Sequence, residues 1–269
     1  MHTLPTPRRA RRPLLELPPA EVHLWRLDRR RFTEPLHEAW TNCLSDAERA
    51  ELERRRHPGV RNEYGLTRAF VRRLLSRYRA VDPRDWSFTA NSHGRPEISR
   101  PETHAELRFN LSHTDGWIVM IVAHRRTVGV DVEGLRRPRD LQALARRFFS
   151  LTEADDVAAC PEPERARRFL TYWTLKEAFV KARGEGLTLP LDRFWFQPSP
   201  DGRLAMRVDP RFVEDPARWR IWQTKLSERH HLAACVLAGA DEPTLLLRQF
   251  DLHPDGASTP VDTAVLLPP

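Results

Sequence analysis

The order of helical and strand patterns along the chain constrains its fold more than any other feature. Residues 45–80 and 140–184 carry apolar side chains at helical spacing, and strand-like segments joined by short turns follow each region. The strict alternation of strand and helix that is typical of a parallel sheet does not occur. We therefore expect an α+β fold with an N-terminal half at residues 21–124 and a C-terminal half at residues 125–240.

Local signals mark the ends of several elements. The tetrapeptide SDAE at residues 45–48 fits a capping box, with Ser as the N-cap and Glu at the third helical position. The longest helical pattern spans residues 164–184 and ends at Gly184. Residues 107–113 and 117–123 predict two strands joined by a turn, and residues 127–133 predict a further strand.

Both ends of the chain differ from its middle. We expect the Arg/Pro-rich residues 1–20 to be poorly ordered and the Pro-rich residues 241–269 to form a C-terminal tail. No run of apolar residues is long enough for a membrane helix, and the N-terminus lacks the apolar segment of a secretory signal. Three widely separated cysteines argue against a disulfide framework, so we expect a cytoplasmic protein.

Positive charge dominates, and it is almost entirely arginine. The net charge of +7 suggests an anionic partner such as a phosphorylated small molecule, an acidic protein or a nucleic acid. Of the 44 basic residues only Lys176, Lys181 and Lys225 are lysines, and two of these three lie in the stretch WTLKEAFVK at residues 173–181. Because lysine presents a compact point charge where arginine presents a planar fork, this choice suggests a specific chemical role.

A helical projection of that stretch separates two faces. Lys176, Glu177 and Lys181 fall on one face together with Trp173, and the apolar side chains of residues 175, 178, 179 and 182 fall on the face expected to contact the core. The alternative is a surface helix with an ordinary charge pattern.

The segment GVDVE at residues 129–133 places two carboxylates on one side of a predicted strand. Asp131 and Glu133 are two residues apart, so they project the same way and repel each other unless a cation compensates them. Mg²⁺ prefers such oxygen ligands, and Glu177 could supply a third carboxylate. The alternative is a polar, solvent-facing edge of a half-buried strand.

Two further positions suit phosphate recognition. The segment FNLSH at residues 109–113 ends a strand before a turn, so His113 can bind a phosphate oxygen or move a proton, unless it is purely structural. Arg61 lies near the start of a predicted helix, where a phosphate would also meet the helix N-terminus.

Taken together, these motifs resemble those of the 4′-phosphopantetheinyl transferases. FNLSH, GVDVE and WTLKEAFVKARGEGL occur in the order typical of the longer, surfactin-synthetase-activating type, and HGRP at residues 93–96 precedes them. The resemblance covers roughly residues 45–240 and implies two similar α+β halves related by pseudo-twofold symmetry within a monomer.

The resemblance also implies an activity and a set of site residues. Members move the 4′-phosphopantetheine arm of coenzyme A to a serine of an acyl or peptidyl carrier protein and release 3′,5′-ADP. It assigns Asp131, Glu133 and Glu177 to Mg²⁺, which Mn²⁺ could replace, and leaves open whether Glu177 is instead the base for the carrier serine. It assigns contacts with coenzyme A to Arg61, Arg95, Ser112, His113, Lys176 and Lys181.

Two other classes fit parts of the pattern. A metal-dependent nuclease also uses paired carboxylates and lysines, but Leu135 stands where such sites place a lysine. A basic nucleic-acid-binding protein would show a stripe of arginines with aromatic platforms, whereas these arginines are interleaved with acids. We therefore expect neither a nucleic-acid nor a membrane partner. The sequence does not distinguish carriers of fatty-acid, polyketide or nonribosomal-peptide synthesis.

Overall fold

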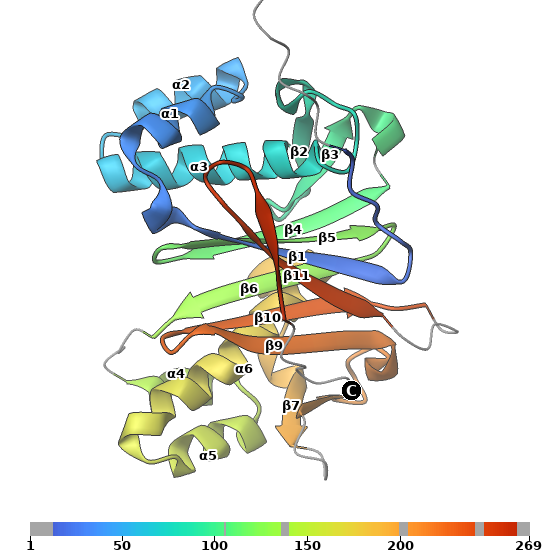
Figure 1. Ribbon diagram of the computed structural model, residues 1–269. Helices are drawn as coiled ribbons and strands as arrows, with labels where there is room; N and C mark the ends of the chain where they lie inside the picture. The colour runs from blue at the N-terminus through green and yellow to red at the C-terminus, as the bar shows by residue number, and fades with distance from the viewer. Residues whose placement is uncertain (1–12, 105, 136–139, 199–203, 240–244, 263–269) are drawn as a thin grey trace, which may run out of the picture.

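The computed structural model describes residues 13–104, 106–135, 140–198, 204–239 and 245–262, and it shows four layers. Two β-sheets lie face to face, and helices cover the outer face of each (Figure 1). This arrangement confirms the predicted α+β class.

The first half begins with a strand and continues through three helices, a hairpin and two more strands. Its sheet has the order β12-β11-β1-β5-β4, in which β12 and β11 come from the C-terminal end of the chain. The elements of this half are β1 (Glu21–Asp28), α1 (Glu34–Thr41), α2 (Asp46–Arg54), α3 (Pro58–Leu75), β2 (Ser87–Ala90), β3 (Pro96–Arg100), β4 (Leu107–Thr114) and β5 (Trp117–His124).

The second half repeats this order of elements. Its sheet has the order β6-β10-β9, so in both halves the first strand pairs with the last strand, which pairs with the last but one. The elements are β6 (Val128–Gly134), α4 (Leu141–Phe148), α5 (Leu151–Ala159), α6 (Glu162–Arg183), β7 (Phe194–Pro198), β8 (Leu204–Val208), β9 (Trp219–Ser227) and β10 (His230–Leu237). The two halves are therefore similar in topology, and the pseudo-twofold relation between them stays a prediction.

Three apolar clusters form the core. One lies between the first sheet and α1–α3, the second between the other sheet and α4–α6, and the third between the two sheets. Val128, Val130 and Val132 of β6 belong to the cluster between the sheets. Alternation along β6 therefore directs the intervening side chains to the opposite face, toward α6.

Strands β4 and β6 join the halves through side chains. The amide of Val130 donates to Asn110 Oδ1 at 3.0 Å, and the amide of Val132 donates to Ser112 Oγ at 3.4 Å. Side chains of β4 thus satisfy backbone donors of β6 that would otherwise be buried without partners. This junction places Ser112 beside Asp131.

The C-terminal segment is not the tail that its composition suggests. Residues 246–261 form β11 (Leu246–Leu252) and β12 (Ser258–Val261), and β11 pairs in parallel with β1. The connecting turn is held as well, because Trp40 Nε1 donates to the carbonyl of Pro254 at 2.7 Å. The expectation of a tail is therefore wrong for these residues, since the open edge of β1 provides pairing partners that the local sequence does not reveal.

The prediction that residues 1–20 are poorly ordered can be compared with the structure only for residues 13–20. Residues 1–12 lie outside the described residues. Residues 13–20 pack against the first half, where the amide of Leu15 donates to the carbonyl of Arg77 at 2.6 Å and the side chains of Leu15 and Leu17 contact the core. This part of residues 1–20 is therefore ordered, contrary to the prediction.

Candidate active site

Strand β6 presents its acidic residues to helix α6. Gly129 lies on the same face, and a Cβ atom at this position would stand only 2.0 Å from the carbonyl oxygen of Ala178. Glycine therefore allows a close approach of strand and helix that no other residue permits. The predicted alternation of this strand is confirmed, with Asp131 buried at 3% exposure and Glu133 partly exposed.

One narrow stripe of α6 faces this acidic strand. Between Phe169 and Ala182 only four side chains are not buried, and three of them follow one another at intervals of four residues: Trp173, Glu177 and Lys181. Together with β4 and β6 they surround a cavity of about 420 Å³. Its lining consists of Leu111, Ser112, His113, Asp131, Glu133, Trp173, Glu177 and Lys181.

Lys181 is joined to Asp131 in the lining of this cavity. Lys181 Nζ donates to Asp131 Oδ1 at 2.7 Å and to Ser112 Oγ at 2.8 Å, and Ser112 Oγ donates to Asp131 Oδ1 at 2.9 Å. The second carboxylate oxygen, Asp131 Oδ2, is buried and has no hydrogen-bond partner. A buried, unpartnered anionic oxygen is costly, so this atom is suited to accept a cation.

Glu177 has the electrostatic character of a proton acceptor near neutral pH. Burial raises the pKa of Glu177 to about 7, the neighbouring charges of Asp131 and Glu133 act in the same direction, and Lys181 opposes them. Asp131 and Glu133 therefore lie close enough to Glu177 to influence its protonation.

The structure contradicts the predicted position of Lys176. Its side chain is 0% exposed and forms an ion pair with Glu153 of α5, with 2.8 Å between Nζ and Oε2. The helical projection failed because α6 packs against β6 and β10 on one side and against α5 and β7 on another. Lys176 faces the second side, so it does not join Glu177 and Lys181 at the cavity.

His113 and Ser112 line the cavity but differ in surroundings. Ser112 is buried in the network with Asp131, whereas the side chain of His113 is 44% exposed, with Nδ1 at 3.4 Å from Glu63 Oε1. Burial lowers the pKa of His113, and the neighbouring Lys181, Arg29 and Arg68 act in the same direction while Glu63 opposes them. Sequence analysis did not identify Arg29 and Arg68 as candidate site residues, because nothing in their spacing distinguishes them from the other arginines.

Arg95 lies in a second cavity that continues from the first. This cavity of about 240 Å³ shares Leu111, Glu177 and Lys181 with the first one. Arg95 Nη1 donates to the carbonyl oxygens of Ala182 at 2.7 Å and Lys181 at 3.3 Å, so the guanidinium holds the C-terminal end of α6. The predicted contact of Arg95 with coenzyme A stays a prediction, and these bonds already use part of its donors.

Two glycines also border this second cavity. Gly184 and Gly186 both line it, and both have positive φ angles. In the sequence analysis only Gly184 was considered, as the residue at which a helix ends. That both glycines border a cavity could not be predicted from the sequence, because it depends on where the loop around His93 lies. The His93 side chain lies against Gly186.

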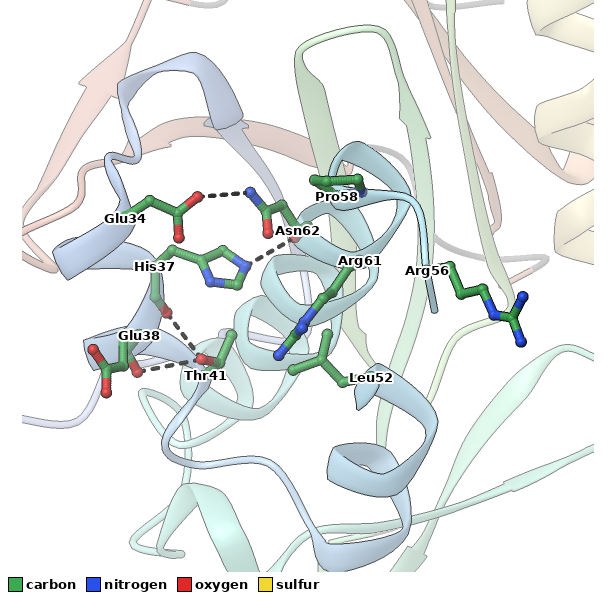
Figure 2. Close-up of a pocket in the computed structure, with 9 residues that line it drawn as sticks. All are labelled: Glu34, His37, Glu38, Thr41, Leu52, Arg56, Pro58, Arg61 and Asn62. Carbon is green, nitrogen blue, oxygen red and sulfur yellow. Dashed lines mark hydrogen bonds between the residues drawn. The ribbon is translucent and has the colours of Figure 1, made fainter. Parts of the chain in front are cut away.

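Arg61 is not brought to the other predicted residues. It lines a separate cavity of about 620 Å³ between α1, α2 and the start of α3, which shares no lining residue with the two cavities beside α6. Figure 2 shows the Arg61 side chain directed toward Thr41 and Leu52. The predicted contact of Arg61 with coenzyme A stays a prediction.

A preformed metal centre is not evident. Within the described ranges, His, Cys, Asp and Glu side chains form no group of three or more that is arranged to hold a metal ion. Lys181 occupies one oxygen of Asp131, as described above. The assignment of Asp131, Glu133 and Glu177 to a metal therefore stays a prediction.

None of the described helices combines the length and the apolar character needed to cross a membrane.

Comparison with known proteins identifies the family of this chain. The sequence model of the 4′-phosphopantetheinyl transferase superfamily matches residues 127–235. The chain is 35% identical to the 4′-phosphopantetheinyl transferase HetI of Nostoc sp. over 175 residues, which cover 65% of this chain and 73% of that protein. It is 31% identical to the 4′-phosphopantetheinyl transferase Sfp of Bacillus subtilis over 180 residues, which cover 66% and 77% of the two chains.

These similarities show that the chain belongs to the 4′-phosphopantetheinyl transferase superfamily, which confirms the resemblance found in its motifs. Among solved structures, the holo-[acyl-carrier-protein] synthase of Thermotoga maritima matches with a TM-score of 0.34 and 24% identity, over 42% of this chain and 64% of that one.

Proposed function

We propose that this chain transfers the 4′-phosphopantetheine arm of coenzyme A to a serine of an acyl or peptidyl carrier protein and releases 3′,5′-ADP. The observation that carries the proposal is the cavity in which Asp131, Glu133, Glu177 and Lys181 converge from β6 and α6. Attack by a serine oxygen on a phosphoryl group requires positioned charges of both signs, and this cavity provides them.

The acidic residues suit a divalent cation. Asp131, Glu133 and Glu177 offer only oxygen donors. The unpartnered Asp131 Oδ2 favours a positive charge among them, and so do the burial of Glu177 and its repulsion by Asp131 and Glu133, which together raise the pKa of Glu177. We propose that these residues hold Mg²⁺, with Mn²⁺ as a substitute. When bound, the cation would neutralise charge on the diphosphate of coenzyme A.

The remaining residues bind, orient and accept a proton. Lys181 presents its ammonium group inside the cavity, where it can contact a phosphate oxygen. Where Asp131 and Glu133 alone hold the cation, Glu177, with a pKa of about 7 in the absence of the cation, is instead available to accept the proton of the carrier serine. His113 lies at the exposed rim beside Arg29 and Arg68, where a further phosphate of coenzyme A would meet positive charge.

A surface beside the cavity suits the carrier protein. Leu141, Leu144 and Phe148 of α4 pack against the core of the second half and stay partly exposed, and the Phe148 ring contacts Trp173 of the cavity with 6.0 Å between centroids. Arg146 and Arg147 are exposed on the same helix. Carrier proteins are generally acidic, so we propose that α4 docks the carrier near the serine-accepting site, with one chain acting as a monomer.

A mass measurement tests the proposed function. Purified enzyme is incubated with coenzyme A, Mg²⁺ and each member of a panel of apo carrier proteins. We expect the mass of at least one carrier to rise by one phosphopantetheine arm, and to stay unchanged when its acceptor serine is replaced by alanine. No mass increase across fatty-acid, polyketide and nonribosomal-peptide carriers would contradict the proposal.

An isosteric variant links the reaction to the cavity. Asp131→Asn keeps the shape of a side chain that is buried between Ser112 and Lys181 but removes its charge. We expect a loss of transfer of at least about a hundredfold, comparable to the loss of one preorganised electrostatic group. Circular dichroism in the near ultraviolet should show an unchanged fold.

A further inference from the structure

In each half of the molecule a buried ion pair fastens the long helix to the helix before it. In the first half Arg72 of α3 pairs with Glu48 of α2, with 2.7 Å between Nε and Oε2. In the second half Lys176 of α6 pairs with Glu153 of α5 at 2.8 Å. The Lys176 and Glu153 side chains are both 0% exposed, and those of Arg72 and Glu48 are 3% and 13% exposed, which is unusual for charged groups.

The two acidic partners hold the same local position. Glu48 closes a capping box with Ser45 at the start of α2, and Glu153 closes one with Ser150 at the start of α5. Each glutamate therefore receives the basic side chain at the oxygen that also accepts from the N-cap residue. The amide of Phe196 in β7 donates to the other oxygen of Glu153 at 2.9 Å.

The two basic partners also bond to the same part of each half. Arg72 Nη1 donates to the carbonyl oxygens of Pro83 at 3.0 Å and Trp86 at 2.7 Å, at the 3-10 turn that precedes β2. Lys176 Nζ donates to the carbonyl oxygens of Leu191 at 2.8 Å and Phe194 at 2.6 Å, at the 3-10 turn that precedes β7. We call the pair Glu153–Lys176 with these carbonyl contacts the α6 brace.

Lys176 has no donor left for a ligand. An ammonium group carries three N–H donors, and Glu153, Leu191 and Phe194 accept from all three. The rings of Phe149 and Phe194 enclose the group, with Nζ 4.5 Å from the centroid of Phe194. A phosphate could reach this ammonium only if the packing between α5, α6 and β7 opened.

We propose that Lys176 is a positioning residue, which fixes the rotation of α6 so that Glu177 and Lys181 face the cavity, and that it contacts no part of coenzyme A. Lys176 and Glu177 are adjacent, so they project about 100° apart around the helix. Anchoring one of them therefore sets the direction of the other. The role of Glu177 and Lys181 in this statement rests on the proposed function, whereas the protection of Lys176 does not.

Amine labelling of the wild-type enzyme tests the contact directly, because the chain has only three lysines. The folded protein is treated with acetic anhydride with and without coenzyme A whose thiol has first been blocked by acetylation, and the modified lysines are identified by mass spectrometry. We expect rapid labelling of the exposed Lys225, slower labelling of Lys181 that coenzyme A suppresses, and labelling of Lys176 only after unfolding. Labelling of Lys176 in the folded enzyme, suppressed by coenzyme A, would overturn the proposal.

Matched variants test the positioning role. Lys176→Met removes the α6 brace, and Arg72→Met removes its counterpart in the half that lacks the acidic strand. We expect Lys176→Met to lower kcat at least tenfold and Arg72→Met to change kcat less than twofold, at a temperature where near-ultraviolet circular dichroism shows both variants folded. An equal loss of kcat in both variants, or an unchanged kcat in Lys176→Met, would contradict a positioning role.

Removing the charges of both Glu153 and Lys176 should restore part of the kcat that Lys176→Met loses. Glu153→Gln combined with Lys176→Met leaves no unpaired charge in the core. We expect kcat at least fivefold above that of Lys176→Met alone, with a KM for coenzyme A within threefold of wild type. A folded double variant whose kcat is no higher than that of Lys176→Met alone would show that an unpaired Glu153 is not what disturbs α6, and would contradict the role given to the pair.

The labelling result separates this inference from the proposed function. A wild-type enzyme that transfers nothing to any carrier would refute the proposed function, and Lys176 would still be protected. If a variant does not fold, the labelling of Lys176 in the wild-type enzyme still tests whether this residue contacts coenzyme A.

Discussion

Lys181 Nζ lies 2.7 Å from Asp131 Oδ1, so the ammonium group partly neutralises the buried carboxylate in the lining of the cavity beside α6. The lysine comes from α6 and the aspartate from β6, which Gly129 brings close together. The same ammonium is the proposed contact for a phosphate oxygen. Asp131 therefore holds Lys181 inside the cavity, which limits the rotamer freedom that the side chain would lose on binding.

Replacement of Lys181 should strengthen the binding of the cation and weaken the binding of coenzyme A. In Lys181→Met the charge of Asp131 is no longer offset, so we expect Mn²⁺ to bind severalfold more tightly in the absence of coenzyme A. The KM for coenzyme A should rise at least tenfold, since a charged contact to phosphate is lost. Electron paramagnetic resonance of free Mn²⁺ and steady-state kinetics measure the two effects.

The control for this variant is Lys225→Met, which removes an exposed lysine. Lys225→Met should change neither the Mn²⁺ affinity nor the KM for coenzyme A by more than about twofold, as expected for a solvent-exposed charge. An unchanged Mn²⁺ affinity in Lys181→Met would show that Lys181 and the cation do not compete for the charge of Asp131.

Gly129→Ala should destabilise the protein strongly. The added methyl group would lie 2.0 Å from the Ala178 carbonyl oxygen and 2.4 Å from the Ala182 amide nitrogen, and neither backbone atom can move without shifting α6. We expect a loss of at least ~2 kcal/mol in the free energy of unfolding, measured by urea titration. Gly59→Ala, where the nearest atoms belong to the His57 side chain at 3.3 Å, should cost less than ~1 kcal/mol.

His231 should make the stability depend on pH. Burial lowers the pKa of His231 to about 4, with the charges of Lys225 and Arg167 as smaller causes. Between pH 6.5 and 4 the unfolded chain therefore binds a proton that the folded chain does not, so stability falls as the pH falls through this window. At pH 5 we expect His231 to contribute a loss of roughly 2 kcal/mol relative to pH 7.5, from a shift of this size.

Urea unfolding at both pH values checks this prediction. His231→Asn should reduce the difference in unfolding free energy between pH 7.5 and pH 5 by about that amount. The exposed His57 serves as the control, and His57→Asn should leave the difference unchanged. An equal pH dependence in wild type and His231→Asn would mean that His231 is protonated as easily in the folded protein as in the unfolded chain.

Charge reversal on α4 should weaken recognition of the carrier protein. Arg146→Glu combined with Arg147→Glu replaces two exposed positive charges beside the Phe148 and Trp173 rings. We expect the KM for an acidic apo carrier to rise at least tenfold, with the KM for coenzyme A unchanged, because like charges would then face each other. The increase should diminish at high salt, where such charges are screened.

Arg100→Glu combined with Arg207→Glu makes the same change in net charge at exposed positions that line none of the described cavities. Its KM for the carrier should rise far less than that of the α4 variant. Equal increases in both variants would indicate that overall charge, and no particular surface, governs the encounter.

Local signals in the sequence were sufficient for most elements and for half of the site. Alternation in residues 127–133 placed Asp131 and Glu133 on one face, and the capping box at Ser45 and the Gly184 terminus were read correctly. Helix α1 and strands β3, β11 and β12 were missed. Strand β11 in particular forms because the edge of β1 offers hydrogen-bond partners more than 200 residues away in the chain.

The sequence by itself determined the family, the α+β class, the acidic strand and the helix that carries Glu177 and Lys181, because these depend on motif order and on short-range periodicity. Only the tertiary structure decided which side of that helix each lysine faces. A projection of α6 gives the angles between its side chains but not the elements packed around it. With α5 and β7 on one side and β6 on the other, Lys181 reaches Asp131 and Lys176 is buried against Glu153.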